Sequence, residues 1–422
     1  MSIAANPPLP AHLKWYMGGL GTYFFATGIQ MVLAPWLIKE VLGMGPEYVG
    51  IAQACSMLAM LLLGLFGGAT ADRMELRSYL MRLQLMGMVV PLTLAAAIYM
   101  GYLSYPVMIV YLLVFSTLGA FVTPARDSLL TRVINRERPG AIQKAVASAM
   151  SMQFLSQVLG NLLSGLAGLA GPLFIVLTQA LALAAAAFTT SRLPKAPPPP
   201  AAPLKEDQKR PSQWQLIKEG LVIVWQSERL RPVITMMFSS GVLYIGVFMV
   251  FFPILIPDVY GGGSAALAGV YVVFFSGIGI SSTVQSRLRP IKRQGRAIML
   301  ALCTGSAAMV GFHFEPPFWS VYALAACWGL AAGVSMTQSR AIVQEFASDT
   351  HRARVLSIFQ LGMMGGGPIG SFATGYIIKA IGPLNAVLVP SAAMVVVWLT
   401  MFFFSPLWGL EAPPHKMGSG AS

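Results

Sequence analysis

Two stretches of this sequence place an arginine where ion pairing or anion binding is possible inside an otherwise apolar chain. The first, FVTPARDSLLTRV at residues 121–133, sets Arg126 beside Asp127. The second, SMTQSRAIVQEFA at residues 335–347, repeats the Thr-x-x-Arg pattern and ends it on Arg340. A guanidinium can pair with a carboxylate, and its planar donors can hold a carboxylate or phosphate through two hydrogen bonds.

A second pattern of chemistry-bearing residues is uncharged. Gln153, Gln157 and Asn161 recur every four residues, so on a helix they form one polar stripe. Isolated amides in apolar segments often bond only to neighbouring helices, whereas three on one face favour a cavity wall. The predicted substrate-binding residues are Gln30, Gln153, Gln157, Asn161, Tyr244 and Gln360.

The composition requires that lipid cover the elements that carry these residues. Of 422 residues, 56% are apolar and 10% charged, and the mean hydropathy is +0.69. A soluble domain carries about 25% charged residues. Several apolar runs exceed the roughly 18 residues that mark a bilayer span, and their Leu, Ala and Met content favours helices over a barrel. The chain is therefore predicted to be an all-α membrane protein.

About twelve spans follow from the apolar runs. They are predicted at Trp15–Leu42, Tyr48–Ala71, Tyr79–Gly101, Tyr105–Leu130, Ile142–Ala167, Pro172–Thr190, Pro232–Val259, Leu267–Val284, Ala297–Phe314, Trp319–Phe346, Val355–Ile381 and Leu384–Trp408. No cleavable signal peptide is expected, because the first span is too long for the apolar region of one.

The basic residues orient these spans. All but two of the 28 Lys and Arg residues, Lys39 and Lys379, fall on the side of the amino terminus. Cytoplasmic loops carry such an excess of positive charge, so both termini are expected in the cytoplasm, with the chain in the inner (cytoplasmic) membrane. Since the net charge of +13 is distributed between spans, it does not indicate a nucleic-acid partner.

The chain is expected to divide into two six-helix halves. Residues 1–192 would form the first half and 230–410 the second, followed by a cytoplasmic tail at 411–422. Residues 193–229 read as a proline-rich cytoplasmic linker that ends in an amphipathic helix. Aligning the two Thr-x-x-Arg patterns also brings the glycines at 160 and 370 to within four residues of each other. The halves are therefore predicted to be pseudo-symmetric repeats, as in rocking transporters.

Other classes of site find little support in the sequence. Cys55, Cys303 and Cys327 lie in spans without paired spacing, so neither a disulfide nor a metal site is expected. None of the four histidines lies well inside a span, no ATP-binding motif is present, and no charged residue lies near a midplane. No catalytic residue, metal or cofactor is therefore predicted.

Two motifs resemble those of a known family. GGATADRMELR fits the major facilitator superfamily pattern through Gly68, Asp72, Arg73 and Arg77. FVTPARDSLL is similar to the signature of a branch that contains enterobactin exporters, macrolide-efflux proteins and lysophospholipid transporters. The resemblance extends over nearly the whole chain and implies the major facilitator fold. The chain departs from the family at Gly160-Asn161, where relatives often carry Gly-Pro.

The resemblance also implies a gate at the cytoplasmic ends of the helices. Asp72 would lie against the amino end of the helix that starts near residue 354, and Arg73 or Arg77 would pair with Asp127. Arg126 and Arg340 are assigned to the same gate. Anchoring remains an alternative for Arg126, since 22 residues from Ser104 span about 33 Å and reach the interface.

The predicted function is secondary active export of an amphipathic small molecule, such as a siderophore or drug, by a monomer. Alternating access would be coupled to protons, as the family implies. A lysophospholipid flippase is the alternative, and a membrane enzyme or sensor a more distant one. The partners expected are the substrate, the bilayer and protons.

The topology can be tested by cysteine labelling. In a chain whose native cysteines are replaced, a cysteine at Pro199 should react with a membrane-impermeant maleimide only in inverted vesicles, because the linker is expected in the cytoplasm. Labelling in intact spheroplasts would overturn this orientation.

Overall fold

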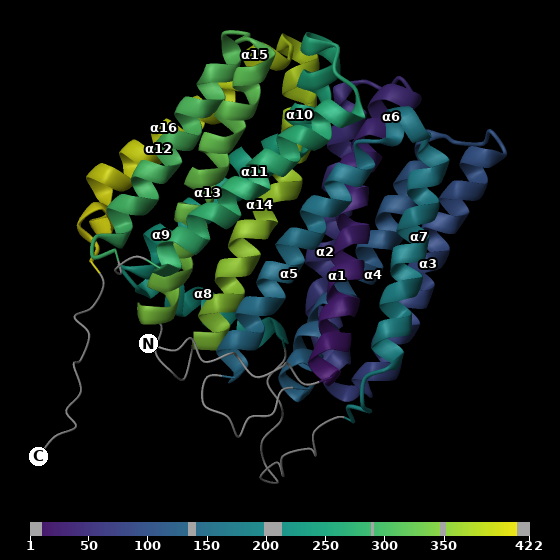
Figure 1. The fold of residues 1–422 in the computed structure, drawn as a ribbon. Helices are drawn as coiled ribbons and strands as arrows, with labels where there is room; N and C mark the ends of the chain where they lie inside the picture. Colours follow the sequence, from purple (N-terminus) through teal and green to yellow (C-terminus); the bar gives the residue numbers. More distant parts are fainter. Residues whose placement is uncertain (1–10, 134–140, 198–212, 288–290, 347–351, 412–422) are drawn as a thin grey trace, which may run out of the picture. The chain divides into compact units, whose positions relative to one another are not determined.

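The fold is built from helices. The computed structural model describes residues 11–133, 141–197, 213–287, 291–346 and 352–411, and every regular element in these ranges is helical (Figure 1). The first of these are α1 (Ala11–Trp36), η1 (Leu37–Val41), α2 (Pro46–Arg73), α3 (Leu76–Tyr99), α4 (Tyr105–Val133), α5 (Ala141–Ser164), α6 (Ala167–Ala170), α7 (Pro172–Ser191) and α8 (Gln213–Gln226). They are followed by α9 (Leu230–Ser240), η2 (Gly241–Ile245), α10 (Gly246–Tyr260), α11 (Ser264–Arg287), α12 (Gln294–His313), α13 (Phe318–Phe346), α14 (Arg352–Ile381), α15 (Pro383–Ala386), α16 (Leu388–Phe404) and η3 (Pro406–Gly409).

The predicted spans are confirmed as helices. Ten helical segments of the described chain are long and apolar enough to cross a membrane. The α5 and α14 helices, of 24 and 30 residues, occupy the positions predicted for the fifth and eleventh spans. The amphipathic helix expected near the end of the linker is present as α8. The chain is therefore an all-α protein with about twelve spans.

The repeat seen in the sequence is also present in the helices. The α4 and α13 helices both have 29 residues, and both carry the Thr-x-x-Arg pattern toward their carboxyl ends. The packing partners repeat as well, since α1 packs on α5 in the first half and η2 packs on α14 in the second. The pseudo-symmetric architecture is therefore confirmed at the level of helix packing.

Glycines allow the first and fifth helices of each half to approach closely. A Cβ atom added at Gly160 of α5 would overlap the backbone carbonyl of Phe25 in α1. A Cβ atom added at Gly370 of α14 would overlap the carbonyl of Val242 in η2. Membrane helices use small residues in this way to bring backbones together. The same contact occurs in both halves, at the two glycines that the sequence alignment paired.

The chain forms two compact units. The first contains residues 1–206 and 256–272, and the second contains residues 207–255 and 273–422. The main boundary between the two units, after residue 206, therefore lies within the predicted linker. The short segment 256–272 is an exception, because it follows that boundary in the sequence but belongs to the first unit. The predicted boundaries at 192 and 230 stay a prediction.

Two predicted spans contain a π-helical turn that the sequence did not indicate. Residues 37–41 (η1) form the end of the first span, and residues 241–245 (η2) interrupt the seventh between α9 and α10. These are corresponding helices of the two halves. A π turn widens the backbone and often marks a functional position, and here the turns carry Lys39 and Tyr244.

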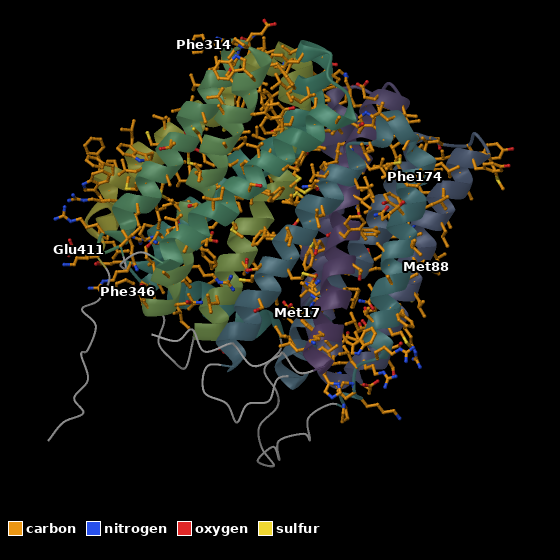
Figure 2. All side chains as sticks on the ribbon, viewed as in Figure 1. Met17, Met88, Phe174, Phe314, Phe346 and Glu411 are labelled. Atoms are coloured by element: carbon orange, nitrogen blue, oxygen red, sulfur yellow. The ribbon has the colours of Figure 1, made fainter. Side chains whose placement is uncertain are left out.

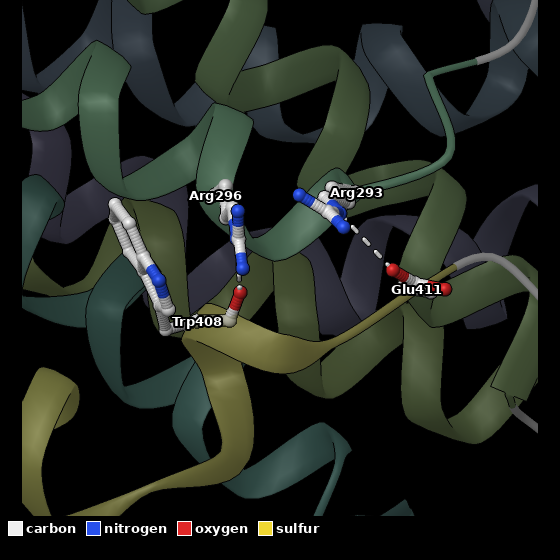
Figure 3. Close-up of polar contacts among 4 residues, drawn as sticks. All are labelled: Arg293, Arg296, Trp408 and Glu411. Carbon is white, nitrogen blue, oxygen red and sulfur yellow. Dashed lines mark hydrogen bonds and ion pairs between the residues drawn. The ribbon is translucent and has the colours of Figure 1, made fainter.

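The carboxyl-terminal segment after α16 is fixed to the start of α12 (Figure 3). The Arg296 Nε–H donates to the carbonyl of Trp408 at 3.3 Å, and its guanidinium lies 5.2 Å from the Trp408 ring centroid. The Arg293 Nε lies 3.2 Å from Glu411 Oε1. Because both side chains of this second pair are more than half exposed, it adds little stability.

Candidate functional site

The polar stripe predicted on α5 lies along its contact with α1. The Gln157 side chain is half-buried, and its Nε2 lies 3.4 Å from the sulfur of Met31 in α1. Asn161 is fully buried, yet neither its Oδ1 nor its Nδ2 has a hydrogen-bond partner in the described chain. A buried amide without partners costs free energy. Such a group is available to a water molecule or a ligand.

Gln30 adds a further unpaired amide oxygen to this region. It lies one residue before Met31 on α1, and its Oε1 is buried without a partner in the described chain. Gln153 lies two turns before Asn161 and is half-buried. Gln30, Gln153, Gln157 and Asn161 therefore lie on two helices that pack directly on each other.

The other two predicted substrate residues lie in the second unit. Tyr244 is buried, and its hydroxyl lies 2.6 Å from the carbonyl of Leu302 and 2.7 Å from Ser306 Oγ. Its ring packs edge-on against Trp328. Gln360 is exposed on α14. Tyr244 is thus part of a well-bonded aromatic core, whereas Gln360 is open to its surroundings.

Two other amides inside spans hold helices together. Gln179 accepts a hydrogen bond from the Tyr111 hydroxyl at 2.9 Å and donates to the carbonyl of Ala26 at 3.2 Å. Gln338 donates to Gln285 Oε1 at 2.7 Å. These bonded amides contrast with those of Gln30 and Asn161, whose buried atoms have no hydrogen-bond partner in the described chain.

Arg126 is enclosed by α1. Its side chain is 4% exposed, and its Cζ lies 4.3 Å from the ring centroid of Phe24 and 5.3 Å from that of Tyr23. The Tyr16 hydroxyl donates to the Arg126 carbonyl at 3.2 Å and so fixes the backbone of α4 to α1. The Nη2 atom lies 3.8 Å from Asp127 Oδ1. The Nε and Nη1 atoms are buried and have no partner in the described chain.

The remaining predicted gating residues differ from Arg126 in burial. Arg340, its counterpart in the repeat, is exposed, and so are Arg73 and Asp127. Arg77 is half-buried. The Asp72 side chain lies outside the described residues. Pairing of Arg73 or Arg77 with Asp127 therefore stays a prediction.

A capping residue that the sequence analysis did not select fixes the loop between α2 and α3. Glu75 accepts hydrogen bonds from the backbone N–H groups of Arg77, Ser78 and Ala196 at 2.8–3.1 Å. Partial burial raises the pKa of the Glu75 carboxyl, but these hydrogen bonds together outweigh burial and lower the pKa to about 2. Glutamate is not among the residues that usually cap helix starts, so no common capping pattern marks Glu75 in the sequence.

An ion pair at the other ends of the helices was also missed. The Lys39 Nζ lies 2.7 Å from Asp258 Oδ1, within the first compact unit. In the same unit, the Ser264 hydroxyl donates to the carbonyl of Gly165 at 2.8 Å and accepts from the N–H of Gly168 at 2.9 Å. The sequence analysis noted Lys39 as one of two basic residues on the side of the membrane opposite the amino terminus. It did not predict the pair, because Asp258 is 219 positions away in the sequence.

Catalysis and metal binding find no further support. Within the described residues, no three His, Cys, Asp or Glu side chains gather in a group that could hold a metal ion. Figure 2 shows side chains along all of the helices, with aromatic residues such as Phe174 and Phe314 among them. The buried polar groups without a hydrogen-bond partner in the described chain include the Gln30 and Asn161 amides and the Arg126 guanidinium, and groups of these kinds can bind a ligand.

Single substitutions can distinguish the predicted binding role of the α5 stripe from the structural role of Gln179. Gln157→Leu or Gln153→Leu should weaken substrate binding and leave the Tm unchanged, because Leu suits a membrane helix and the only side-chain bond lost in the described chain is the weak one from Gln157 to the Met31 sulfur. Gln179→Leu should lower stability by about 1–3 kcal/mol, because it leaves the buried Tyr111 hydroxyl unpaired. Melting curves and binding assays on the purified variants check both outcomes. If Gln157→Leu lowers the Tm as much as Gln179→Leu and binds normally, the stripe only holds helices together.

Comparison with solved structures shows the fold. The chain superimposes on the nucleoside transporter NupG with a TM-score of 0.75 at 12% identity, covering 94% of this chain and 100% of NupG. The superposition on a D-xylose–proton symporter has a TM-score of 0.71 at 12% identity and covers 93% of this chain and 98% of the symporter. The superposition on the human organic anion transporter MFSD10 has a TM-score of 0.63 at 16% identity and covers 93% of this chain and 99% of MFSD10. No curated protein matches the sequence.

The family is shown by the sequence itself. Residues 16–414 match the family of transmembrane secretion effectors, so the match covers nearly all of the spans described above. Together with the pseudo-symmetric helices and the transporter fold of the similar structures, it makes the chain a multi-pass membrane protein and a secondary transporter. The chain belongs to the transmembrane secretion effector family of the major facilitator superfamily.

Proposed function

We propose that the chain exports an amphipathic small molecule, such as a siderophore or drug, across the inner membrane in exchange for protons. The family of secretion effectors supports outward transport. The observation that carries the substrate class is the contact of α1 with α5, where amide atoms of Gln30 on α1 and Asn161 on α5 are buried without a partner in the described chain. An amphipathic ligand could bond to the amides and place its apolar part against neighbouring Met and Phe side chains.

Export would proceed by alternating access in a monomer. The gate at the cytoplasmic ends of the helices would involve Asp127 and the loop that carries Asp72, Arg73 and Arg77. Glu75 supports this role, because its cap on α3 gives that loop a fixed conformation. Coupling to protons is proposed on the family alone, since the sequence places no carboxylate near a midplane.

A lysophospholipid flippase is the second candidate. A groove of about 690 Å³ lies between α3 and α4, and its lining is almost wholly apolar, including Met86, Val89, Val110 and Val114. Such a groove could take an acyl chain of a lipid. An enzyme or sensor has less support, because the family model and the similar structures are of transporters.

Transport is tested with the purified chain in proteoliposomes. A siderophore, a cationic dye and a lysophospholipid are offered separately, with and without an imposed pH gradient. We expect uptake of the siderophore or the dye into vesicles that hold the chain inside out, accelerated when the vesicle interior is acidic. If only the lysophospholipid is transported, the flippase proposal replaces the exporter proposal. Absence of transport for every compound under both conditions would contradict both.

The gate is tested by Asp127→Asn, which removes the charge without changing the size of the side chain. Since Asp127 is 69% exposed, its ion pair is worth up to about 1 kcal/mol. That value corresponds to about a fivefold shift toward the state open to the cytoplasm. Distances between spin labels on the cytoplasmic ends of the helices measure this shift. The exposed Glu40 on η1 gives the control Glu40→Gln. Unchanged distances in Asp127→Asn would remove Asp127 from the gate.

A further inference from the structure

The Arg126 guanidinium has fewer partners than a buried charge requires. Its side chain is 4% exposed, and both Nε and Nη1 lack a hydrogen-bond partner in the described chain. The Asp127 carboxylate, 3.8 Å from Nη2, is beyond hydrogen-bond distance and mostly exposed. A buried charge is stable only when it is paired or fully hydrogen-bonded. The side chain therefore has capacity for a further negatively charged or strongly accepting group.

The surroundings of Arg126 hold its plane and leave its N–H edge unused. The rings of Phe24 and Tyr23 lie 4.3 and 5.3 Å from Cζ, distances at which a cation is attracted to the face of a ring. Neither ring supplies an acceptor for the Nε–H and Nη1–H groups in this arrangement. These two N–H groups lie on different edges of the guanidinium, and each edge is completed by Nη2. A carboxylate or phosphate can therefore be held through two parallel bonds from Nη2 and either Nε or Nη1.

Topological anchoring does not account for this environment. An anchoring arginine extends its head group into water or the lipid headgroups. Arg340, which occupies the equivalent position in the repeat, is exposed in this way. Arg126 is enclosed instead, although both residues end a Thr-x-x-Arg pattern in a helix of 29 residues. The difference between the two copies points to a binding role for Arg126.

We propose that Arg126 forms an anion-binding site with Phe24 and Tyr23, and that this site takes the carboxylate or phosphate group of an amphiphile. The inference rests on the proposed function, because it narrows the amphipathic substrate to an anionic one. The same chemistry is offered by an anionic lipid headgroup. Arg126 lies about 33 Å along α4 from its outer end, near the level of the headgroups. An anionic amphiphile would thus place its charge at Arg126 and its chain against apolar helices.

Binding of charge-matched probes tests the site. The full chain is placed in phosphatidylcholine nanodiscs, and radiolabelled dodecyl phosphate is competed with dodecanoate or dodecyltrimethylammonium. We expect both anions to bind and the cation of the same chain length not to compete. Arg126→Gln should weaken dodecyl phosphate binding by about tenfold or more, because charge-assisted hydrogen bonds are lost. Arg126→Lys should not restore it, because Lys keeps the charge but lacks the fork.

Two controls separate binding from folding. Arg82 is an exposed arginine of α3 in the same unit, so Arg82→Gln removes the same charge and should leave binding unchanged. If Arg126→Gln fails to insert, Phe24→Leu decides, because it keeps the arginine and removes the nearer ring. Phe24→Leu should weaken anion binding several-fold. The proposal would be overturned if dodecyltrimethylammonium competed as well as dodecanoate in the wild-type chain. It would also be overturned if Arg126→Gln bound dodecyl phosphate as tightly as Arg82→Gln does.

Two further measurements identify the source of the anion and test whether the site takes part in transport. Displacement of dodecyl phosphate by phosphatidylglycerol in the nanodiscs would support the site with a lipid headgroup as its ligand, and absence of displacement would support a soluble substrate. Arg126-dependent binding without transport in proteoliposomes would keep the site and contradict the exporter. Transport that does not discriminate between the anion and the cation would keep the exporter and contradict the site.

Discussion

The first unit depends on a backbone-to-backbone contact between α1 and α5. At Gly160 the two helices touch without intervening side chains, so larger residues elsewhere on α1 are directed to its other neighbours. Tyr16, Tyr23 and Phe24 contact α4 around Arg126, and the carbonyl of Ala26 receives the amide of Gln179 from α7. The same contact at Gly370 in the second unit shows that the constraint belongs to the repeat. One helix therefore sets the positions of the polar residues on three others.

Within this frame, the two copies of the repeat have diverged in how their polar groups are satisfied. In the first, Arg126, Gln30 and Asn161 keep buried atoms without partners in the described chain. In the second, Gln338 is bonded to Gln285 and Arg340 is exposed, although Gln294 Oε1 and Ser339 Oγ are buried without a hydrogen-bond partner in the described chain. Unpaired polar atoms inside a membrane protein are costly and tend to be functional. The clearest difference between the two copies is therefore at the paired arginines, since Arg126 is buried and Arg340 is exposed.

Much of the fold was predictable because a bilayer leaves few alternatives. Apolar runs fixed the spans, and the paired Thr-x-x-Arg patterns indicated the repeat that α4 and α13 confirm. The stripe on α5 was predictable from its four-residue spacing. The π turns, the Lys39–Asp258 pair and the enclosure of Arg126 by Phe24 were not, because each depends on contacts between helices far apart in sequence. Tyr244 shows the same limit, since a polar residue inside a span can equally belong to a bonded core.

The central claim is that the buried guanidinium of Arg126 receives its missing partner from an anionic ligand. An experimental structure of the full chain with dodecyl phosphate bound tests this most directly, because it shows which atoms surround Nε and Nη1. We expect phosphate oxygens about 2.7–2.9 Å from Nη2 and from either Nε or Nη1, with the guanidinium still over the rings of Phe24 and Tyr23. A guanidinium turned fully onto Asp127 or into water, with the phosphate elsewhere, would contradict the account.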